Sequence, residues 1–343
     1  MTMLNQMYIS IAGEDRLALF AVDGDTGTLT PRVDAEVSGR PAPMAVDPKR
    51  KYLYVGRRGE RKISGYRIDP ETGVLSLVGT VPLKSDPCYL ATDRTSRFLF
   101  SSYYEAGGVA VHQIGDDGAP ITPPVVWLAT GRGAHSIQTD PTNQFAFVPH
   151  IAGPNGPNMI LQFKFEADTG LLTPNAPPKV EPSTRVGPRH FCFHPSKPIL
   201  YFSNEQGCSV TGYWMDPDAG TLSPFQTVST LPQDFHGRNS CAQIQIAPSG
   251  KFLYAPNRGH NTIACFSVDS ETGRLTSTGW IPTEPIPRAF NLDPSGNYLY
   301  VAGLESGRLA SYRINQQSGQ LQPLQTYALG KEPMWVLITQ LRG

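Results

Sequence analysis

The chain has 343 residues, and its 29 Lys and Arg residues are balanced by 29 Asp and Glu residues. A chain without net charge offers no basic field for nucleic acid or for an anionic membrane surface, so we expect neither partner. No stretch approaches the roughly 18 apolar residues of a membrane span. The first 13 residues lack the basic start and apolar run of a signal peptide. We therefore expect a cytoplasmic protein.

The five cysteines are scattered and odd in number, and no two of them form a CxxC pair. A zinc ribbon or a redox dithiol is therefore not expected. The sequence also lacks an HExxH motif, an EF-hand loop, a P-loop and the Gly-Xaa-Ser-Xaa-Gly elbow of serine hydrolases. We expect no cofactor and no metal site, and the sequence leaves an assisting divalent cation open.

One short turn recurs along the whole chain: acidic or polar residues, then glycine, then an apolar residue two positions later. Its glycines are Gly27, Gly73, Gly118, Gly170, Gly220, Gly273 and Gly319, at steps of 46, 45, 52, 50, 53 and 46 residues. A period of this size indicates stacked or radial copies of one supersecondary unit, each burying an apolar face against its neighbours. We therefore expect a single domain over residues 1–343.

A second repeated element precedes each turn: an Asp-Pro or Pro-Ser-Gly turn followed by a short run that contains an aromatic residue, as in 47–55 and 247–255. Such turns, flanked by runs rich in Val, Ile, Phe and Tyr, indicate antiparallel strands. The aligned aromatic residues number seven: Tyr8, Tyr54, Phe100, Phe147, Tyr201, Tyr254 and Tyr300.

The clearest unit has four expected strands, at residues 289–292, 297–302, 308–314 and 321–329. Four antiparallel strands at this period are typical of a β-propeller blade, so we predict an all-β, seven-bladed propeller. A β-sandwich is the alternative fold, but sandwiches lack such a period. We expect the ring to close in a shared blade, where residues 334–338 pair with 7–10, 17–22 and the run near Val33.

Polar residues gather at two equivalent positions of the repeats. In a meander blade the second strand returns antiparallel to the first, so the start of the first strand and the end of the second lie on the same face. The first position holds Ala42, Cys88, His135, Arg189, Ala242 and Arg288. The second holds Arg57 and Arg58, Tyr103 and Tyr104, His150, Asn204 and Glu205, Asn257 and Arg258, and Gly303 and Leu304.

These positions change identity from blade to blade and are rich in charge, whereas purely structural positions would carry similar residues in each copy. We therefore predict a ligand site at one mouth of the channel. The alternative is that these side chains are solvated loop ends. His190, next to Arg189, equally suits substrate binding or packing beneath the strand.

Three runs resemble a known family. Residues 187–195 read Gly-Pro-Arg-His-Phe-Cys-Phe-His-Pro, residues 201–205 read Tyr-Phe-Ser-Asn-Glu, and residues 287–296 read Pro-Arg-Ala-Phe-Asn-Leu-Asp-Pro-Ser-Gly. Together with the Thr-Gly-x-Leu turns, they resemble the seven-bladed propeller lactonases, which include bacterial 6-phosphogluconolactonases and fungal 3-carboxymuconate lactonizing enzymes. The resemblance spans nearly the whole chain, and its most specific feature is the 16-residue spacing from Arg189 to Glu205.

The resemblance implies a lactonase that opens a sugar-acid lactone, such as 6-phosphogluconolactone or an aldono- or aldarolactone. It implies catalytic roles for His135, Arg189, Glu205 and Arg258, which the repeat positions also single out. Because guanidinium groups hold anions bidentately, we expect an arginine clamp on an anionic substrate. Glu205 or His135 is the expected general base, and a histidine titrates closer to neutral pH. Further substrate-binding candidates are Arg288, His150, His190, Asn204, Asn257, Arg57 and Tyr103.

Residues 149–157 read Pro-His-Ile-Ala-Gly-Pro-Asn-Gly-Pro, where relatives often carry an acidic run, so the sequence leaves the particular lactone open. Two other functions also stay open. One is a muconate-type lactonizing cycloisomerase, which would use the same site in the ring-closing direction. The other is a non-catalytic propeller that binds a ligand or protein, for which a large apolar surface patch is expected. The expected partner is a small anionic lactone, and the expected state is a monomer or small homo-oligomer.

Overall fold

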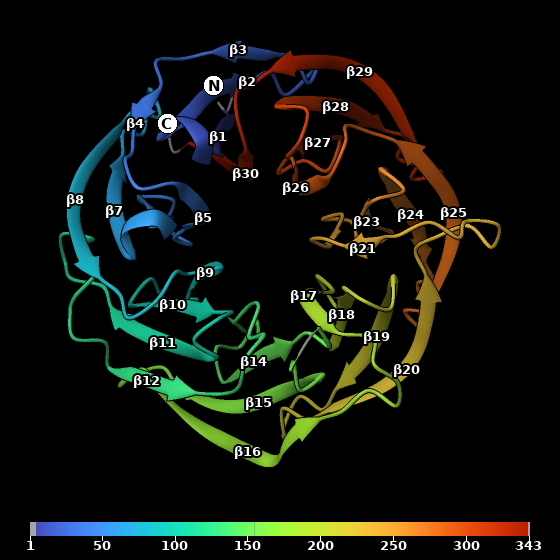
Figure 1. Ribbon diagram of the computed structural model, residues 1–343, viewed down its shortest axis with the longest axis horizontal. Coiled ribbons are helices and arrows are strands. Elements are labelled where there is room, and N and C mark those ends of the chain that lie inside the picture. The colour runs from blue at the N-terminus through green and yellow to red at the C-terminus, as the bar shows by residue number, and fades with distance from the viewer. Residues whose placement is uncertain (1–4, 154, 342–343) are drawn as a thin grey trace.

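The computed structural model describes residues 5–153 and 155–341. These residues form seven antiparallel β-sheets arranged around a central axis (Figure 1). The protein is therefore a seven-bladed β-propeller, and the fold predicted from the repeat is confirmed.

Six blades are formed by consecutive strands, numbered here from the axis outward. The first consists of β5 (Pro41–Val46), β6 (Tyr52–Arg57), β7 (Lys62–Ile68) and β8 (Leu75–Pro82). The second consists of β9 (Tyr89–Thr92), β10 (Phe98–Tyr103), β11 (Gly108–Gln113) and β12 (Val126–Ala129). The third consists of β13 (Gln138–Thr139), β14 (Phe145–His150), β15 (Met159–Glu166) and β16 (Leu171–Val180).

The next three blades follow the same order. The fourth consists of β17 (Pro188–Phe193), β18 (Ile199–Asn204), β19 (Ser209–Met215) and β20 (Leu222–Ser229). In the fifth, the split inner strand β21 (Ser240–Cys241) and β22 (Gln245–Ile246) precedes β23 (Phe252–Arg258), β24 (Thr262–Val268) and β25 (Leu275–Pro282). The sixth consists of β26 (Pro287–Leu292), β27 (Tyr298–Gly303), β28 (Arg308–Ile314) and β29 (Leu321–Ala328).

The seventh blade joins the two ends of the chain, as the sequence predicts. Its inner strand β30 (Pro333–Gln340) pairs with β1 (Asn5–Ile11), which pairs with β2 (Arg16–Val22). The outer position is shared by two short pieces, β3 (Leu29–Pro31) and β4 (Ala35–Glu36), and Val33 lies in the break between them with 84% of its surface exposed. Pairing of β1 with β30 leaves no open sheet edge where the ring closes.

The two sequence repeats lock neighbouring blades together. The Tyr201 hydroxyl on β18 donates a hydrogen bond of 2.6 Å to the carbonyl of Gly273, the turn glycine of the next blade. Gly273 has a φ of 68°, and a Cβ there would lie 2.3 Å from Ile199 Cδ1, so a side chain would not fit. The tyrosines aligned with Tyr201 make the same bond to the turn glycine of the following blade: Tyr8 to Gly73, Tyr54 to Gly118, Tyr254 to Gly319 and Tyr300 to Gly27.

The Asp-Pro turns close the opposite face of the ring. Asp47 accepts hydrogen bonds from the backbone N–H groups of Lys49, Lys51 and Tyr52, and thereby fixes the turn between β5 and β6. His194 takes the same place in the fourth blade, where its Nδ1 lies 3.2 Å from the Ser196 nitrogen. These acidic residues are therefore turn residues, as the sequence indicates.

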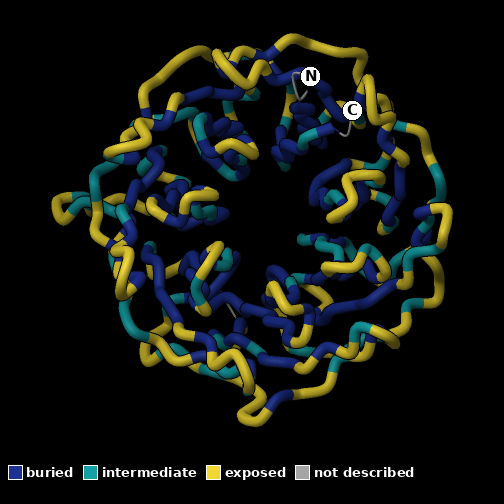
Figure 2. Tube along the Cα trace, turned by 180° about the vertical axis from the view of Figure 1, so that it is seen from behind, coloured by how far each residue is buried: buried dark blue, intermediate teal, exposed yellow. Residues whose placement is uncertain are grey.

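The second strand of a blade is more buried than the inner strand before it, and the outermost strand is the most exposed, as the sixth blade shows (Figure 2). β27 is buried throughout, whereas β29 is mostly exposed at the rim. The outermost strands therefore face solvent, and the inner strands position the side chains that reach the channel. No helix in the described ranges is long and apolar enough to cross a membrane.

Candidate active site

The inner strands of the fourth and sixth blades begin with a β-bulge that carries an arginine. In the fourth blade the pairing passes from Pro188↔Asn204 to His190↔Ser203, so Arg189 is the extra residue. A bulge bends the strand and redirects the side chain that it carries. The proline that opens the strand has no N–H to lose and follows a residue of positive φ, Gly187 at 71°.

The same local structure recurs at two further blades. The register shift between Pro287 and Ala289 makes Arg288 the extra residue, and the preceding Ile286 has a φ of 53°. In the seventh blade Met334 is the extra residue opposite Ser10 and Ile11. In the fourth and sixth blades the bulge therefore sets the direction of the side chain five positions before the turn, Arg189 or Arg288.

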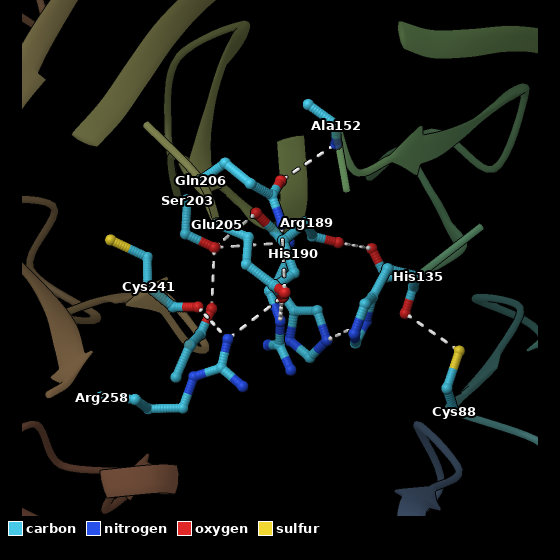
Figure 3. A network of polar contacts seen from close by, with 12 residues as sticks. Cys88, His135, Ala152, Arg189, His190, Ser203, Glu205, Gln206, Cys241 and Arg258 are labelled. Carbon is cyan, nitrogen blue, oxygen red and sulfur yellow. Dashed lines mark hydrogen bonds and ion pairs between the residues drawn. The ribbon is translucent and has the colours of Figure 1, made fainter. Parts of the chain in front are cut away.

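The end of the second strand supplies the partner of Arg189. Glu205 follows β18 directly, and its backbone N–H donates to the Gly187 carbonyl at 2.7 Å. Its Oε2 accepts a hydrogen bond of 2.6 Å from Arg189 Nε and lies 3.1 Å from Arg258 Nη2 of the next blade. Arg258 Nη2 also donates to the Cys241 carbonyl at 2.7 Å. One carboxylate thus holds two guanidinium groups from neighbouring blades (Figure 3).

Two imidazole rings lie next to this ion pair. His135, at the start of the inner strand of the third blade, has its Nδ1 3.2 Å from His190 Nε2 (Figure 3). His190 in turn packs edge-on against Tyr89, with ring centroids 5.1 Å apart, and contacts Trp335 at 6.0 Å. The His135 backbone N–H is held by the Pro149 carbonyl at 3.0 Å. His190 is therefore positioned to orient the His135 ring.

The cluster has more positive charge than Glu205 neutralises. Among the described residues, Arg189 Nη1 and Arg258 Nε are buried without a hydrogen-bond partner. Arg288 has no side-chain hydrogen bond or ion pair within the same described ranges. Buried donors without partners are costly, so a cluster of this kind favours an anion that satisfies them.

Burial and charge set the protonation states. Burial raises the pKa of Glu205, but Arg189 and Arg258 outweigh it and the net pKa is lowered, so this carboxyl is ionised. Burial, followed by the positive charge of Arg189, lowers the pKa of His135 well below its usual value, so the ring is neutral at pH 7. Burial, followed by Arg189 and Arg258, lowers the pKa of Arg288 to about 9, so the group still carries its charge at neutral pH.

Little space remains inside the cluster. The pocket bounded by Cys88, His135, Arg189, His190 and Arg288 measures about 10 Å³, which is room for about one water molecule. A cavity of about 670 Å³ lies towards the opposite face. Its walls include the turn residues Asp47, Pro48, His194 and Pro195, together with His190 and Trp335. His190 and Trp335 line both spaces and lie between them.

The structure brings together six of the predicted site residues: His135, Arg189, His190, Glu205, Arg258 and Arg288. The other five side chains form hydrogen bonds with residues outside the cluster. Arg57 bonds Ser38, Ser64 and Glu60; Tyr103 bonds Ser101; His150 bonds Thr130; Asn204 bonds Ser209 and Thr211; Asn257 bonds Thr230 and Thr262.

A simple alternation separates these two sets. Three positions after the aligned aromatic residue, the side chain turns away from the cluster, and four positions after it, as at Glu205 and Arg258, it faces the cluster. Successive residues of an extended chain point to opposite sides, so the sequence contained this signal. The same rule assigns Arg58 and Tyr104 to the cluster side, and Tyr104 does lie edge-on to His135 with ring centroids 6.0 Å apart.

No group of three or more His, Cys, Asp or Glu side chains in the described part of the chain is arranged to hold a metal ion. The five cysteines, all within that part, are free thiols. The donors that converge here are guanidinium and imidazole groups, which suit an anionic ligand. Fold and site together define a β-propeller with a buried cluster of arginine and histidine side chains around one carboxylate.

Comparison with known proteins places the chain in a family. The family model described as "Lactonase, 7-bladed beta-propeller" matches residues 7–338. A 6-phosphogluconolactonase of Pectobacterium carotovorum subsp. carotovorum (strain PC1) is 37% identical over 318 residues, 93% of this chain and 94% of the relative. A 6-phosphogluconolactonase of Yersinia pestis (strain Pestoides F) is 35% identical over 337 residues, 98% of each chain. The protein belongs to the seven-bladed β-propeller lactonase family.

Solved structures agree on the fold. The periplasmic gluconolactonase of Pseudomonas aeruginosa superposes with a TM-score of 0.90 at 24% identity, over 99% of this chain and 100% of that one. At this identity the likeness bears on the fold alone. The resemblance expected from the sequence is confirmed by the family match and by the curated relatives.

Proposed function

We propose that the protein hydrolyses a sugar-acid lactone to the open-chain acid at the cluster of His135, Arg189, Glu205, Arg258 and Arg288. The observation that carries this proposal is Glu205 holding Arg189 and Arg258 together while cationic donors beside a neutral His135 stay unsatisfied. The relatives of Pectobacterium and Yersinia, each named 6-phosphogluconolactonase, support the same reaction.

The arginines act on the developing charge of the reaction. When water adds to the lactone carbonyl, its oxygen becomes an oxyanion, and the free Nη1 of Arg189 or the guanidinium of Arg288 donates to it. A donor placed in this way lowers the barrier by about 3 kcal/mol. Because Glu205 holds Arg189 in place before substrate arrives, this donor needs little reorganisation during the reaction.

His135 is the proposed general base. It takes one proton from water while the water oxygen attacks the carbonyl carbon and forms a tetrahedral oxyanion. When this oxyanion collapses, the ring ester C–O bond breaks. The proton then passes to the leaving alkoxide, and the new carboxylic acid releases a proton to solvent. The neutral state of His135 suits this role, and the space for one water beside it places the nucleophile within reach.

Glu205 serves the arginines in this mechanism. An ionised carboxylate that accepts from Arg189 at 2.6 Å and lies 3.1 Å from Arg258 orients both forks. Arg189 and Arg258 already occupy Glu205 Oε2, so we assign proton transfer to His135, whose ring is neutral. This assignment deepens the sequence prediction, which left the base open between the two.

The proposed substrate is 6-phosphogluconolactone or a related aldono- or aldarolactone. The proposed chemistry needs side chains and water and no resident cofactor. We place the reaction in the cytoplasm, carried out by a monomer or a small homo-oligomer without a nucleic-acid or membrane partner. The neutral charge of the chain agrees with the absence of a polyanionic partner.

A panel of lactones tests the function. Proton release in a pH-stat, corrected for spontaneous opening, is measured with 6-phosphoglucono-1,5-lactone, glucono-1,5-lactone and glucaro-1,4-lactone. We expect turnover of at least one of them, reduced by about 100-fold in Arg258→Ala. A folded protein that opens none of these lactones and is instead recovered with a protein partner would favour the non-catalytic function.

A further inference from the structure

A second pocket lies directly beside the cluster, between the first and seventh blades. It measures about 260 Å³, and Met334 lines both it and the one-water space next to His135. Ligand sites begin at about 300 Å³, so this pocket is close to that size whereas the space inside the cluster is far below it. A sugar lactone is larger than the one-water space, and this pocket provides adjoining room on the side of Arg58.

Arg58 forms one wall of this pocket, and its backbone is fixed. It opens the 3₁₀ helix η2 (Arg58–Glu60), where its N–H donates to the Arg40 carbonyl at 3.2 Å. The next N–H, of Gly59, donates to the Gly39 carbonyl at 2.9 Å. Arg58 lies four positions after the aligned Tyr54, the same place that Glu205 and Arg258 occupy in their blades.

The other charged residues of the pocket are paired. Arg40 Nη2 lies 2.5 Å from Glu332 Oε2, and Asp86 Oδ1 lies 3.8 Å from Arg61 Nε. Arg58 has no ion-pair partner within residues 5–153 and 155–341. Arg58 and Met334 line the same pocket, and Met334 also borders the one-water space, so the charge of Arg58 lies close to the cluster.

We propose that this pocket binds the phosphorylated end of the sugar lactone and that Arg58 is the residue that recognises the phosphate. A guanidinium group matches the oxygens of a phosphate with two parallel hydrogen bonds. Asp86 Oδ1 lies 3.8 Å from Arg61 Nε, beyond hydrogen-bond distance, and accepts no hydrogen bond from a described residue, so it can accept one from a sugar hydroxyl. This inference rests on the proposed lactonase function and selects a phosphorylated substrate for that site.

The residues proposed to bind the two ends of the substrate lie in different places. His135, Arg189 and Arg288 act on the lactone carbonyl, whereas Arg58 lies across Met334 from the small space they enclose. Loss of Arg58 should therefore remove the preference for the phosphate ester and leave the opening of an unphosphorylated lactone intact. A role in folding or in the chemical step would instead affect both substrates alike.

The experiment compares the wild type with Arg58→Ala, Arg58→Lys and the control Arg308→Ala. Arg308 is an exposed arginine on the same face of the ring, 3.7 Å from Glu284, and its replacement changes the net charge equally. For Arg58→Ala we expect kcat/KM on 6-phosphoglucono-1,5-lactone to fall about 10- to 100-fold. On glucono-1,5-lactone we expect a change of less than about threefold, with Arg58→Lys intermediate on the phosphorylated substrate.

A binding measurement separates this inference from the lactonase proposal. Titration calorimetry with the products 6-phosphogluconate and gluconate does not require turnover. We expect the wild type to bind 6-phosphogluconate at least about tenfold more tightly, and Arg58→Ala to lose that preference while Arg308→Ala keeps it. Equal affinities in the wild type, or an unchanged preference in Arg58→Ala, would overturn the phosphate subsite even if lactones are opened. Failure to open any lactone of the three-member panel, with the preference for 6-phosphogluconate intact, would overturn the lactonase proposal and leave the phosphate site standing.

Discussion

Arg189 Nε donates to Glu205 Oε2 across 2.6 Å, and this bond joins a β-bulge at the start of β17 to the residue that follows β18. The bulge gives Arg189 its direction, and the bond leaves its Nη1 buried and free to meet a ligand. Glu205 therefore fixes the position of Arg189 but leaves one of its guanidinium nitrogens free to donate to a ligand.

The fork of Arg189 is the first feature to test. Arg189→Lys keeps the positive charge but replaces the planar guanidinium with a single ammonium group. We expect this group to bond either Glu205 or the substrate, because it cannot hold both in the geometry that the guanidinium provides. We expect kcat/KM for lactone opening to fall about 100-fold with a small change in thermal stability. Steady-state kinetics and a thermal melt check this, and a lysine variant of wild-type activity would show that the second donor is not used.

The pH dependence tests His135 as the base. Its pKa is held well below 6.5 in the free protein, first by burial and then by Arg189, His190 and Arg288. Protonation, which would abolish base catalysis, therefore occurs only well below pH 6.5, and kcat/KM should stay constant as the pH falls from 8 to 6.5.

Binding of an anionic substrate offsets the positive charges around His135 and so raises its pKa. The acid limb of kcat should therefore lie at higher pH than the acid limb of kcat/KM. Initial rates between pH 4.5 and 8, corrected for spontaneous hydrolysis, measure both limbs. Coincident limbs at the ordinary carboxyl range would point to Glu205 as the base.

His190 is expected to position His135 and not to hold the substrate. His190→Phe keeps the ring among Tyr89 and Trp335 but removes the partner of His135 Nδ1. We expect kcat to fall about tenfold with KM little changed, and His190→Gln, which retains a polar group near the Nε2 position, to recover most of the rate. A raised KM with unchanged kcat would instead assign His190 to substrate binding.

The fold was predictable because it repeats. Each blade repeats the same turn glycine and aligned aromatic residue, so a unit with a weak pattern can be assigned from the others. The split blade follows from the strand-like run at residues 334–338, which has no partner strands next to it in the sequence. The exception is the outer strand of that blade, which breaks into β3 and β4 around the exposed Val33.

The site was predictable only in part. The residues that start the inner strands, such as His135, Arg189 and Arg288, were found because each position occurs once per blade. At the end of each second strand, two adjacent residues are both candidates for the site. Their side chains point in opposite directions, and strand register decides which one faces the cluster. Arg57 was therefore favoured over Arg58, although its guanidinium bonds Ser38 and Glu60.

The contacts between repeats predict a stability effect. Tyr254→Phe removes the donor that satisfies the Gly319 carbonyl at 2.8 Å, so the free energy of unfolding should fall by about 1 to 2 kcal/mol. Tyr52→Phe is the matched control, because the Tyr52 hydroxyl bonds no described side chain or backbone group. Urea denaturation measures both.

The same denaturation curve tests whether residues 1–343 form one domain. Because every blade needs its neighbours to bury its apolar faces, we expect a single cooperative transition. Two resolved transitions in the wild type would indicate that parts of the ring unfold separately.

The most direct measurement is the rate of proton release from 6-phosphoglucono-1,5-lactone by Glu205→Gln compared with the wild type, each confirmed as folded by its thermal melt. The substitution keeps the shape of the side chain but removes the charge that gathers Arg189 and Arg258, so we predict a loss of at least about 100-fold in kcat/KM. A folded Glu205→Gln protein that opens the lactone at the wild-type rate would contradict the assignment of the reaction to this cluster.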